Sequence, residues 1–455
     1  MSIKLMAHQK VSLKKLSSCD AVFDMSDPGT GKTIVQISDI ANTTKIKKHK
    51  TLILAPKSLL RSAWDNDFKK AAPTLSRSIA TATNRTKALN EDSDVYITNH
   101  DAATQLAKMP VSFWKKFQGG TLIIDESSAF KHRTSARSKA VAKISLNFKR
   151  VRLMTGTPST NTICDLWHQV YLLDRGVRLG RSFFAFRGAV CTPKQVGPMP
   201  NMVQWADKDT AEPAVSGLIQ DIVIRHKFED CVDIPKNHQY AIPCFLSVKH
   251  FAAYKELERT SILNISKSTI SAVNGAVLYT KLLQAASGAA YNDEKTYTVI
   301  DTERYELVLD LVEERSHSIV FFNWRHQRDE IIKLAVSAKL PFAVIDGETS
   351  SKERERIVED YQKGFYKFLL AHPQSAGHGL TLTKGIATIW CSPTPNLEHY
   401  LQGLKRIHRI GQTEKTETIM LVAEGTIEEE VYASLLRKDA KMTTLLELLK
   451  KQKRK

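Results

Sequence analysis

The sequence predicts an α/β protein in which two parallel-sheet lobes stand in tandem with a helical insertion between them. Three features support this prediction. The chain has 455 residues, which is too long for one ordinary core and favours two or three domains. Two regions alternate short β-rich apolar runs with helical patterns, as parallel α/β units do. The stretch between these regions lacks that alternation.

Nine apolar runs are the expected buried strands. In the first region they are 21–25, 51–56, 94–98, 121–125 and 152–156, and in the second region they are 318–322, 342–346, 367–371 and 386–390. Each run ends in small or polar residues. Ligands of such sheets bind beyond the carboxyl ends of the strands, so we expect functional residues there.

The intervening stretch sets the expected domain boundaries. It contains a Pro/Gly-rich segment at 192–201 and helical patterns around 214–229 and 245–290. We therefore predict an N-terminal lobe over 1–165, a helical protrusion and linker over 166–300, and a C-terminal lobe with a basic tail over 301–455. No clear internal repeat is visible, although the similar size of the two α/β halves hints at a duplicated fold.

The charge balance favours a polyanionic partner. Lys and Arg total 66 against 48 acidic residues, a formal net charge of +18 with pI near 9.5. Neutralising phosphates releases counterions and supplies non-specific affinity for nucleic acid, whereas solubility alone is the alternative account. For the terminal KKQKRK, a solvated basic tail is favoured over a nucleic-acid contact or a nuclear address.

The cysteines and the N-terminus indicate the compartment. The six cysteines are scattered without a C-x-x-C pair, which fits neither a zinc site nor a disulfide framework. The N-terminus has no apolar signal core, and no run of about 18 apolar residues exists. We expect reduced thiols and a soluble, intracellular protein.

The segment SDPGTGKT at 26–33 has the chemistry of a phosphate-binding loop between a strand and a helix. Glycines let backbone N–H groups wrap an anion, Lys32 suits the β- and γ-phosphates, and the Thr33 hydroxyl suits Mg²⁺. Ser26 stands where the strict pattern has glycine, but the strand–loop–helix context disfavours a chance Gly-rich turn. The expected ligands are ATP and Mg²⁺, held by Asp27, Gly29, Thr30, Gly31, Lys32 and Thr33.

The segment TLIIDESS at 121–128 supplies the expected catalytic partner. A strand there delivers Asp125 to hold Mg²⁺ and Glu126 to orient and deprotonate the attacking water. Alone, such a pair more often marks a solvated surface or a helix start. Its position downstream of the phosphate loop, in the same α/β region, favours the catalytic role.

The ordered set of motifs resembles the superfamily-2 helicases and translocases, and within them the Swi/Snf-type DNA translocase branch. LMTGTPSTN (153–161) resembles motif III and QGLKRIHRIGQ (402–412) resembles motif VI. Motifs Ia, Ib, IV and V are matched in order at 55–68, 95–101, 321–331 and 375–382, and the branch's protrusion and pre-linker segment at 166–180 and 222–237. The resemblance extends from Gln9 to about residue 425 and indicates a compact, phage- or bacteria-like form with a single motor.

This resemblance implies two RecA-like lobes that face each other across a nucleotide cleft. Arg406 and Arg409 lie three residues apart, so in a helix they share a face and can act as arginine fingers on the γ-phosphate. A basic face directed at solvent or DNA is the alternative. With the family resemblance, the finger role is favoured, for Arg409 above all.

Further roles are implied by the resemblance alone. Gln9 is expected to read adenine and Gly379 to contact the nucleotide. Lobe coupling is expected from Thr155, Gly156, Thr157 and Gln402, although turn chemistry also explains the threonines. DNA contacts are expected from Lys57, Ser58, Thr98, Asn99, His100, Gly377 and Thr381, the last standing where the branch often has asparagine. Metal binding by His100 or His378 is disfavoured, and Trp324 and Trp390 are expected to pack at strand ends rather than to stack on bases.

The sequence therefore predicts an ATP hydrolase: a DNA-dependent ATPase that translocates on duplex or branched DNA and remodels DNA or protein–DNA complexes. We expect a monomeric motor, with the cytoplasm of a bacterial or phage-infected cell favoured over the nucleus. A strand-separating DNA or RNA helicase is the first alternative, against which the IHRIGQ ending and the helical insertion argue. A non-catalytic DNA-binding scaffold is the second, against which the intact Lys32, Glu126 and Arg409 argue.

Overall fold

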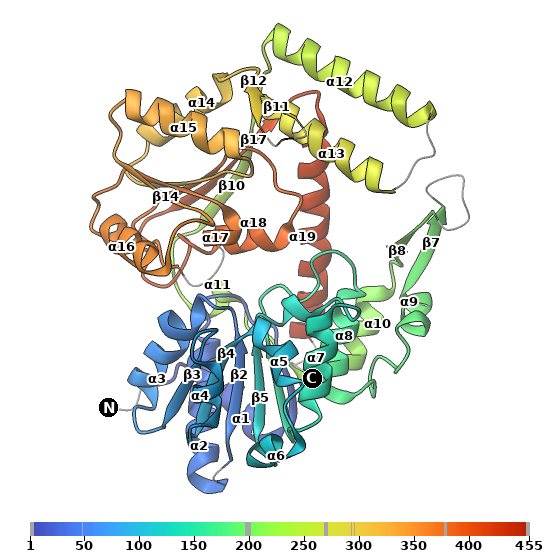
Figure 1. Ribbon diagram of the computed structural model, residues 1–455, viewed down its shortest axis with the longest axis vertical. Coiled ribbons are helices and arrows are strands. Elements are labelled where there is room, and N and C mark those ends of the chain that lie inside the picture. Colours follow the sequence, from blue (N-terminus) through green and yellow to red (C-terminus); the bar gives the residue numbers. More distant parts are fainter. Residues whose placement is uncertain are drawn as a thin grey trace. The chain divides into compact units, whose positions relative to one another are not determined.

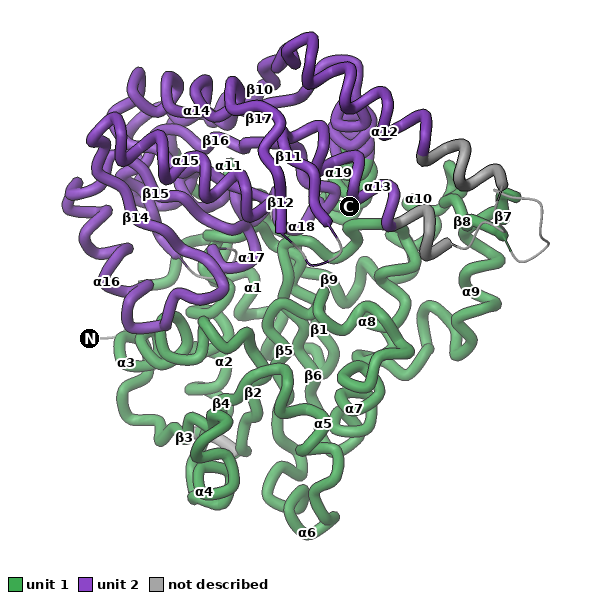
Figure 2. The backbone as a smooth tube through the Cα atoms, turned by 45° about the horizontal axis from the view of Figure 1, so that its top comes forward, with its two compact units in different colours: residues 1–233, 438–455 green, residues 234–437 purple. Residues whose placement is uncertain are grey.

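The computed structural model describes residues 4–47, 49–195, 202–267, 272–292, 294, 296–376 and 380–451. The chain forms two compact units, one of residues 1–233 with 438–455 and one of residues 234–437 (Figure 2). The predicted α/β class with two parallel sheets is confirmed. The division differs from the predicted boundaries at 165 and 300, because the insertion is shared between the units and the C-terminal segment joins unit 1.

Unit 1 is built on a seven-stranded parallel sheet in the order β3-β4-β2-β5-β6-β1-β9 (Figure 1). The strands are β1 (Ala21–Asp24), β2 (Thr51–Ala55), β3 (Arg77–Ala80), β4 (Val95–Asn99), β5 (Thr121–Asp125), β6 (Arg150–Met154) and β9 (Val223–Ile224). Its main helices are α1 (Ala7–Ser18), α2 (Lys32–Lys47), α3 (Asn66–Ala71), α4 (Arg85–Asn90), α5 (Ala103–Leu106), α6 (Val111–Trp114), α7 (Ala136–Ser145) and α8 (Asp165–Asp174).

The central strands of this sheet are buried on both faces, which explains their continuous apolar runs. Every residue of β2, β4, β5 and β6 is buried. Trp64 and Phe68 fill the space over one face, against Ile53, Ile97 and Ile123. The five strands predicted for this region are all present.

Two strands of the seven-stranded sheet were not predicted from the sequence. The edge strand β3 alternates half-buried and buried residues and carries Arg77 and Ser78, so no apolar run marks it. The strand β9 has only two residues and lies in the region expected to be helical. It pairs with β1 at Phe23 and Asp24, directly before the phosphate loop.

The first part of the insertion is not purely helical. After α8 come α9 (Phe183–Val190), an antiparallel ribbon of β7 (Cys191–Gln195) and β8 (Val203–Asp207), α10 (Ala211–Ile219) and α11 (Phe228–Cys231). β7 overlaps the start of the Pro/Gly-rich segment at 192–201, in a region predicted to be a helical protrusion and linker. Its two strands form a sheet of their own, apart from the seven-stranded one.

Unit 2 is built on a six-stranded parallel sheet in the order β10-β17-β16-β13-β15-β14. The strands are β10 (Asn237–Cys244), β13 (Ser318–Phe321), β14 (Phe342–Ile345), β15 (Phe368–Ala371), β16 (Ala387–Trp390) and β17 (Thr416–Ala423), with a small antiparallel pair of β11 (Ala289–Tyr291) and β12 (Tyr297–Val299). Its helices are α12 (Val248–Lys267), α13 (Ala272–Ala286), α14 (Glu303–Glu313), α15 (Arg325–Ser337), α16 (Ser351–Gln362), α17 (Pro373–Ala376) and α18 (Leu397–Leu404).

The four strands predicted for the second region are present, and β10 and β17 complete the sheet. β10 is mostly exposed and therefore carries no apolar run. The last helix, α19 (Ile427–Lys451), begins in unit 2 and contributes its residues from 438 onwards to unit 1.

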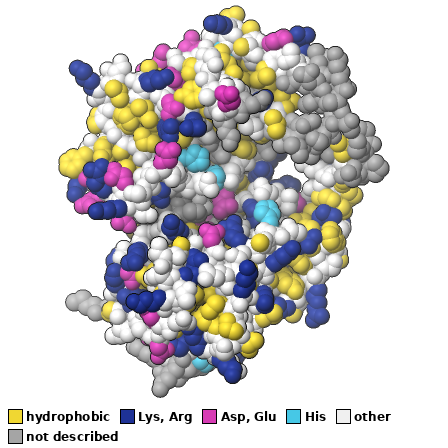
Figure 3. Space-filling model, viewed as in Figure 1, with side chains coloured by type: hydrophobic (Ala, Val, Ile, Leu, Met, Phe, Trp, Pro, Cys, Tyr) yellow, Lys and Arg dark blue, Asp and Glu magenta, His cyan; other side chains and the backbone are white. Residues whose placement is uncertain are grey.

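Across the described residues, no helix combines the length and apolar character that a membrane crossing requires. Lys and Arg side chains are spread over the face shown in Figure 3.

Candidate active site

The phosphate loop connects the end of β1 to the first residue of α2, Lys32. Gly29 and Gly31 have φ angles of 89° and 80°, in the left-handed region that favours glycine. A Cβ at Gly29 would lie 2.9 Å from the ring of Phe228, and one at Gly31 would collide with the Gln9 amide. The loop thus brings backbone and a helix N-terminus together, which is the arrangement that binds phosphate groups.

Ser26 explains the departure from the strict loop pattern. Its N–H donates to Asp24 Oδ1 at 3.0 Å, and its hydroxyl accepts the His226 N–H at 3.1 Å. The serine therefore anchors the start of the loop to the segment after β9. The Lys32 ammonium donates to the carbonyls of Ser26 at 2.7 Å and of Asp27 at 3.2 Å, so it already points back across the loop.

Asp27, predicted to contact the nucleotide, is held by residues that sequence reasoning missed. Its Oδ1 accepts Arg225 Nη1 at 2.5 Å, and its Oδ2 accepts the Phe228 N–H at 2.9 Å. Arg225 also donates to the carbonyl of Met25 at 3.1 Å. Both side chains are largely buried, at 6% exposed for Arg225 and 18% for Asp27. The sequence signal for Arg225 and Phe228 was the family resemblance of the pre-linker segment at 222–237.

Gln9 lies against the same loop. Its Nε2 donates to the Thr30 carbonyl at 3.3 Å, and its Oε1 accepts the Met6 N–H at 2.9 Å. The neighbouring His8 also binds the Thr30 carbonyl through Nε2, at 2.9 Å. α1 is thereby fastened to the phosphate loop, which places the residue expected to read adenine beside the residues expected to hold phosphate.

Asp125 ends β5 and has a dense set of hydrogen bonds. Its Oδ2 accepts the indole N–H of Trp64 at 2.9 Å, and its Oδ1 accepts the Glu126 N–H at 3.1 Å. His100 is hydrogen-bonded through Nε2 to the Asp125 carbonyl at 2.8 Å. Burial, with the charge of Glu126, raises the pKa of Asp125 above its usual range, and the charge of Lys32 opposes this.

Glu126 has a left-handed backbone with φ of 50°, which is uncommon for a residue other than glycine and is found at functional sites. Thr155 donates its hydroxyl proton to Glu126 Oε2 at 3.2 Å, and the Thr157 N–H donates to Thr155 Oγ1 at 3.1 Å. A Cβ at Gly156 would lie 2.6 Å from Pro28 of the phosphate loop. The phosphate loop, the Asp125–Glu126 pair and motif III therefore meet in one place.

The donor set at this place suits Mg²⁺. The hydroxyl of Thr33 and the carboxylate of Asp125 are hard oxygen ligands of the kind that Mg²⁺ prefers. A buried carboxyl group with a raised pKa is also one that a cation stabilises in its ionised form. When bound, the ion would neutralise charge on the β- and γ-phosphates.

The DNA candidates of unit 1 lie at or just beyond the carboxyl ends of β2 and β4, which are neighbours in the sheet. Lys57 is exposed and Ser58 half-buried. Asn99 is 9% exposed and accepts Arg85 Nη2 at 2.9 Å. Thr98 is fully buried and donates to the Ala80 carbonyl at 2.7 Å, while His100 is 7% exposed. In this conformation Thr98 and His100 support the strand ends from inside, and Lys57 is the group open to a phosphate.

Arg406 and Arg409 do not lie in a helix, because α18 ends at Leu404 and turns follow. That premise of the sequence analysis is wrong. The two guanidiniums nevertheless converge, since Nη1 of Arg406 and of Arg409 donate to the Leu380 carbonyl at 3.2 and 3.0 Å. Arg406 is 5% exposed and also binds the Gln402 carbonyl through Nε, at 2.7 Å.

The same carbonyl connects motif VI to motif V. Thr381 adjoins Leu380 and is half-buried, whereas Gly377, His378 and Gly379 lie outside the described residues. Gln402 is 5% exposed and donates to Glu398 Oε1 at 3.3 Å. Arg409 is the more open of the two arginines.

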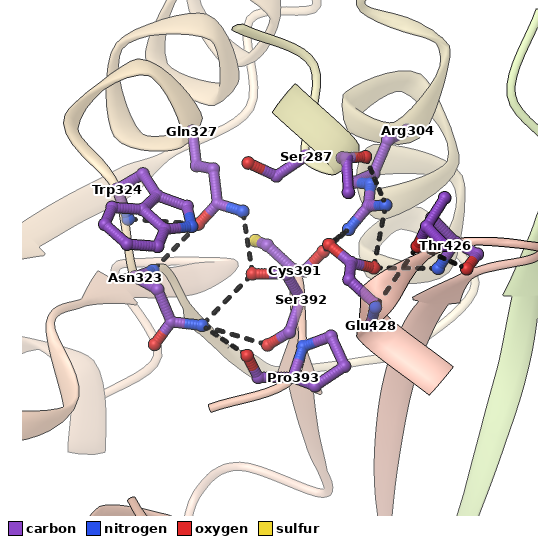
Figure 4. A network of polar contacts seen from close by, with 12 residues as sticks. Ser287, Arg304, Asn323, Trp324, Gln327, Cys391, Ser392, Pro393, Thr426 and Glu428 are labelled. Carbon is purple, nitrogen blue, oxygen red and sulfur yellow. Dashed lines mark hydrogen bonds and ion pairs between the residues drawn. The ribbon is translucent and has the colours of Figure 1, made fainter. Parts of the chain in front are cut away.

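Motif IV organises the polar interior of unit 2 (Figure 4). Asn323 donates to the Ser392 carbonyl at 3.0 Å, and Gln327 donates to the Ser392 hydroxyl at 2.9 Å. The Gln327 Oε1 accepts the Trp324 N–H at 3.2 Å. Trp390 is fully buried with its ring 4.6 Å from that of Phe321, which confirms the packing role expected for it.

Comparison with known families gives these motifs their context. Residues 8–287 match the SNF2-related domain. The chain belongs to the SNF2-related family. Residues 303–411 match the helicase conserved C-terminal domain, so this SNF2-related protein has both parts of a helicase-like motor. The resemblance seen in the sequence is confirmed, and members of the SNF2-related family typically hydrolyse ATP.

Several curated proteins are similar to this SNF2-related chain. Protein p41 of Acyrthosiphon pisum secondary endosymbiont phage 1 is 28% identical over 93% of this chain and 94% of its own length. The human DNA annealing helicase and endonuclease ZRANB3 is 27% identical over 96% of this chain. The SWI/SNF-related regulator of chromatin subfamily A-like protein 1 of Xenopus tropicalis is 26% identical over 90%. The chain spans only 40% and 42% of the last two proteins.

One similar solved structure is the SWI2/SNF2 ATPase core of Sulfolobus solfataricus in complex with dsDNA. It has 22% sequence identity, a TM-score of 0.45, and coverage of 99% of this chain and 95% of that one.

Proposed function

We propose that this SNF2-related protein is a DNA-dependent ATPase that couples ATP hydrolysis to translocation on duplex or branched DNA. The observation that carries the proposal is the meeting of three motifs in unit 1. Lys32 starts α2, Asp125 ends β5, and Glu126 accepts a hydrogen bond from Thr155 of motif III. Thr155, for which we propose a role in lobe coupling, is thereby joined to the group that would activate water.

The residues of the nucleotide site have separate roles in ATP hydrolysis. Lys32 binds the β- and γ-phosphates, and Thr33 with Asp125 holds Mg²⁺. Glu126 orients and deprotonates the attacking water, and its fixed backbone limits the positions its carboxylate can take. Gln9 recognises adenine, and Gly379 contacts the nucleotide. Arg409 supplies positive charge to the transition state, with Arg406 holding the motif V segment in place.

Duplex or branched DNA is the proposed track. The net charge of +18 suits a polyanion, and Lys57 is presented at the carboxyl edge of the unit 1 sheet. Ser58, Asn99, Gly377 and Thr381 offer small polar groups or backbone, which suit sequence-independent contact with phosphates. Thr155, Gly156, Thr157 and Gln402 would couple nucleotide state to this contact. We further propose that the motor acts as a monomer inside the cell.

The decisive experiment measures ATPase rates with duplex DNA, single-stranded DNA, forked DNA, RNA and no nucleic acid. We expect duplex or forked DNA to stimulate the rate most. Lys32→Ala should abolish turnover and weaken ATP binding, whereas Glu126→Gln should abolish turnover and retain ATP binding. Turnover at the wild-type rate in either variant would refute the assignment.

A second comparison separates translocation from strand separation. The wild-type protein is given a DNA triplex and a partial duplex with ATP. Displacement of the third strand without separation of the duplex supports a translocase. Separation of the duplex at a comparable rate would establish the helicase alternative instead.

A further inference from the structure

A surface of alternating aromatic and arginine side chains lies in unit 1, mostly on the insertion. We call it the aromatic–arginine surface and define it as Arg133, Phe183, Phe184, Arg187 and Trp205. Phe183, Phe184 and Arg187 belong to α9, Trp205 belongs to β8, and Arg133 lies in the loop before α7. In Figure 3, apolar and basic side chains adjoin one another over α9 and the β7–β8 ribbon.

The geometry is that of stacked cation–π pairs. The Arg133 guanidinium lies 4.7 Å from the ring centre of Phe183 and 4.8 Å from that of Phe184. The Arg187 guanidinium lies 4.0 Å from the ring centre of Trp205 and 5.4 Å from that of Phe184. Distances of this size give real attraction between cation and ring. The rings of α9 are thus flanked by a positive charge on either side.

The positive charges of Arg133 and Arg187 have no acidic partner among the described residues of unit 1. No carboxylate lies within ion-pair distance of Arg133 or Arg187 in the described part of the chain, and Arg187 Nε is buried without a hydrogen-bond partner there. Residues 175–208 contain six Lys or Arg and one Asp, and of these cations Arg178 is paired with Asp174 and Asp221. Arg181 on the approach to α9 and Lys194 on β7 are exposed. The surface therefore presents uncompensated positive charge beside open aromatic rings.

Packing alone does not account for this surface. Arginine stems often cover apolar area for stability, and that explains a stacked arginine over a buried ring. Phe184, however, remains 62% exposed although two guanidiniums lie near it, so the cluster leaves this ring open to solvent. An exposed ring with cations nearby is suited to a ligand that has both a planar aromatic group and a negative charge.

We infer that the aromatic–arginine surface binds single-stranded DNA, with an unpaired base stacked on Phe184 and the flanking phosphates near Arg133, Arg187 and Lys194. Bases within a duplex are already stacked on one another, so only unpaired bases can use an exposed ring in this way. The inference deepens the proposed function, and rests on it, by naming unpaired strands at branched DNA as the element recognised outside the motor motifs.

The test is the affinity of the full chain for a fluorescein-labelled oligothymidylate, measured by anisotropy without ATP. Phe184→Ala should raise Kd about tenfold, since one base–aromatic stack contributes ~1–3 kcal/mol. Phe184→Trp should retain affinity. Arg133→Gln combined with Arg187→Gln should raise Kd and flatten its salt dependence. Affinity for blunt duplex DNA should change less than twofold in Phe184→Ala.

Phe365→Ala is the matched control, because Phe365 is also 62% exposed but lies in unit 2, before β15. Its Kd for oligothymidylate should equal that of the wild type. The inference is overturned if Phe184→Ala binds oligothymidylate normally, if it loses duplex and single-strand affinity equally, or if polyglutamate competes as well as DNA. If DNA does not stimulate the wild-type ATPase, the proposed function is contradicted. A Kd for oligothymidylate that depends on Phe184 would still support the aromatic–arginine surface as a binding site.

Discussion

At the scale of single residues, the orientation of the buried Asp125 carboxyl group depends on a hydrogen bond from an indole. Trp64 is fully buried and donates its N–H to Asp125 Oδ2 at 2.9 Å. Groups that orient a metal ligand affect metal affinity about 10- to 100-fold when they are removed. Trp64→Phe should therefore raise the Mg²⁺ concentration for half-maximal ATPase activity about tenfold, measured by Mg²⁺ titration.

Trp390→Phe provides the control for this prediction. Trp390 is equally buried, but its indole N–H has no hydrogen-bond partner among the described residues. Its replacement removes a similar volume without removing a hydrogen bond, so the Mg²⁺ requirement should not change. An unchanged requirement in Trp64→Phe would contradict the orienting role.

We propose that Arg225 and Asp27 position the phosphate loop. Their ion pair at 2.5 Å is mostly shielded from solvent. Arg225→Met should raise the KM for ATP about tenfold, equivalent to ~1.4 kcal/mol, with a smaller effect on kcat. Combining it with Asp27→Asn should add little, because both changes break the same contact. Arg259→Met, which breaks an exposed pair with Glu256, should leave KM unchanged.

His326 makes the stability of the protein sensitive to acid. Burial lowers its pKa to about 4, against 6.5 for the free side chain, despite its hydrogen bonds to Ser287 and Tyr291. Below pH 6.5 the unfolded chain binds the proton more readily, so the free energy of unfolding falls as the pH drops toward 4. We expect a loss of about 2 kcal/mol between about pH 7 and about pH 5, measured by urea unfolding.

His326→Gln should remove this part of the pH dependence. The exposed His238 serves as comparison, and His238→Gln should retain the wild-type decline. If His326→Gln loses as much stability on acidification as the wild type does, another group is responsible.

At the scale of elements, a buried ion pair holds the start of α19 to α14. Arg304 donates to both carboxylate oxygens of Glu428 at 3.0 Å, and Glu428 is fully buried (Figure 4). Removing one partner leaves a buried charge unpaired, which costs ~3–5 kcal/mol. Glu428→Gln should lower the free energy of unfolding of unit 2 by about this amount, measured by denaturant titration.

An exposed pair sets the baseline for that measurement. Glu256→Gln removes the partner of Arg259 on α12, where the side chains are 58% and 65% exposed. Its effect on the free energy of unfolding should be close to zero, because solvent screens the pair. Equal costs for the two substitutions would show that burial does not strengthen the Arg304–Glu428 contact.

At the scale of the whole molecule, the charge of +18 predicts that DNA affinity falls steeply with salt. Lys57 lies just beyond the carboxyl end of β2 and is exposed. Lys57→Ala should weaken duplex binding for all sequences alike and reduce the slope of log K against log salt by about 1. The measurement is anisotropy with labelled duplex over a range of NaCl concentrations.

Lys115 offers a charge-matched comparison at the opposite edge of the same sheet. It is exposed, and it precedes β5, a parallel neighbour of β2. Lys115→Ala removes the same charge, so its slope should stay at the wild-type value if DNA binds at the carboxyl edge. Equal slopes for the two variants would indicate a diffuse electrostatic contact.

The apolar runs correctly predicted the class of the fold and nine of its strands, and the motifs predict a phosphate loop with a carboxylate partner. These are local properties: an apolar run marks a strand buried on both faces, and glycines with Lys32 mark a loop whose function depends on adjacent residues. The strands β3, β9 and β10 carried no such mark, because they are partly exposed or very short.

Tertiary contacts, which the sequence did not predict, bring distant residues to the site and support it. Arg225 reaches Asp27 and Trp64 reaches Asp125 because the strands that precede them end at the same edge of one sheet. No spacing along the chain encodes such a meeting. The helix assumed for Arg406 and Arg409 failed for the same reason, since tertiary contacts with the Leu380 carbonyl, and not helical periodicity, bring the two guanidiniums together.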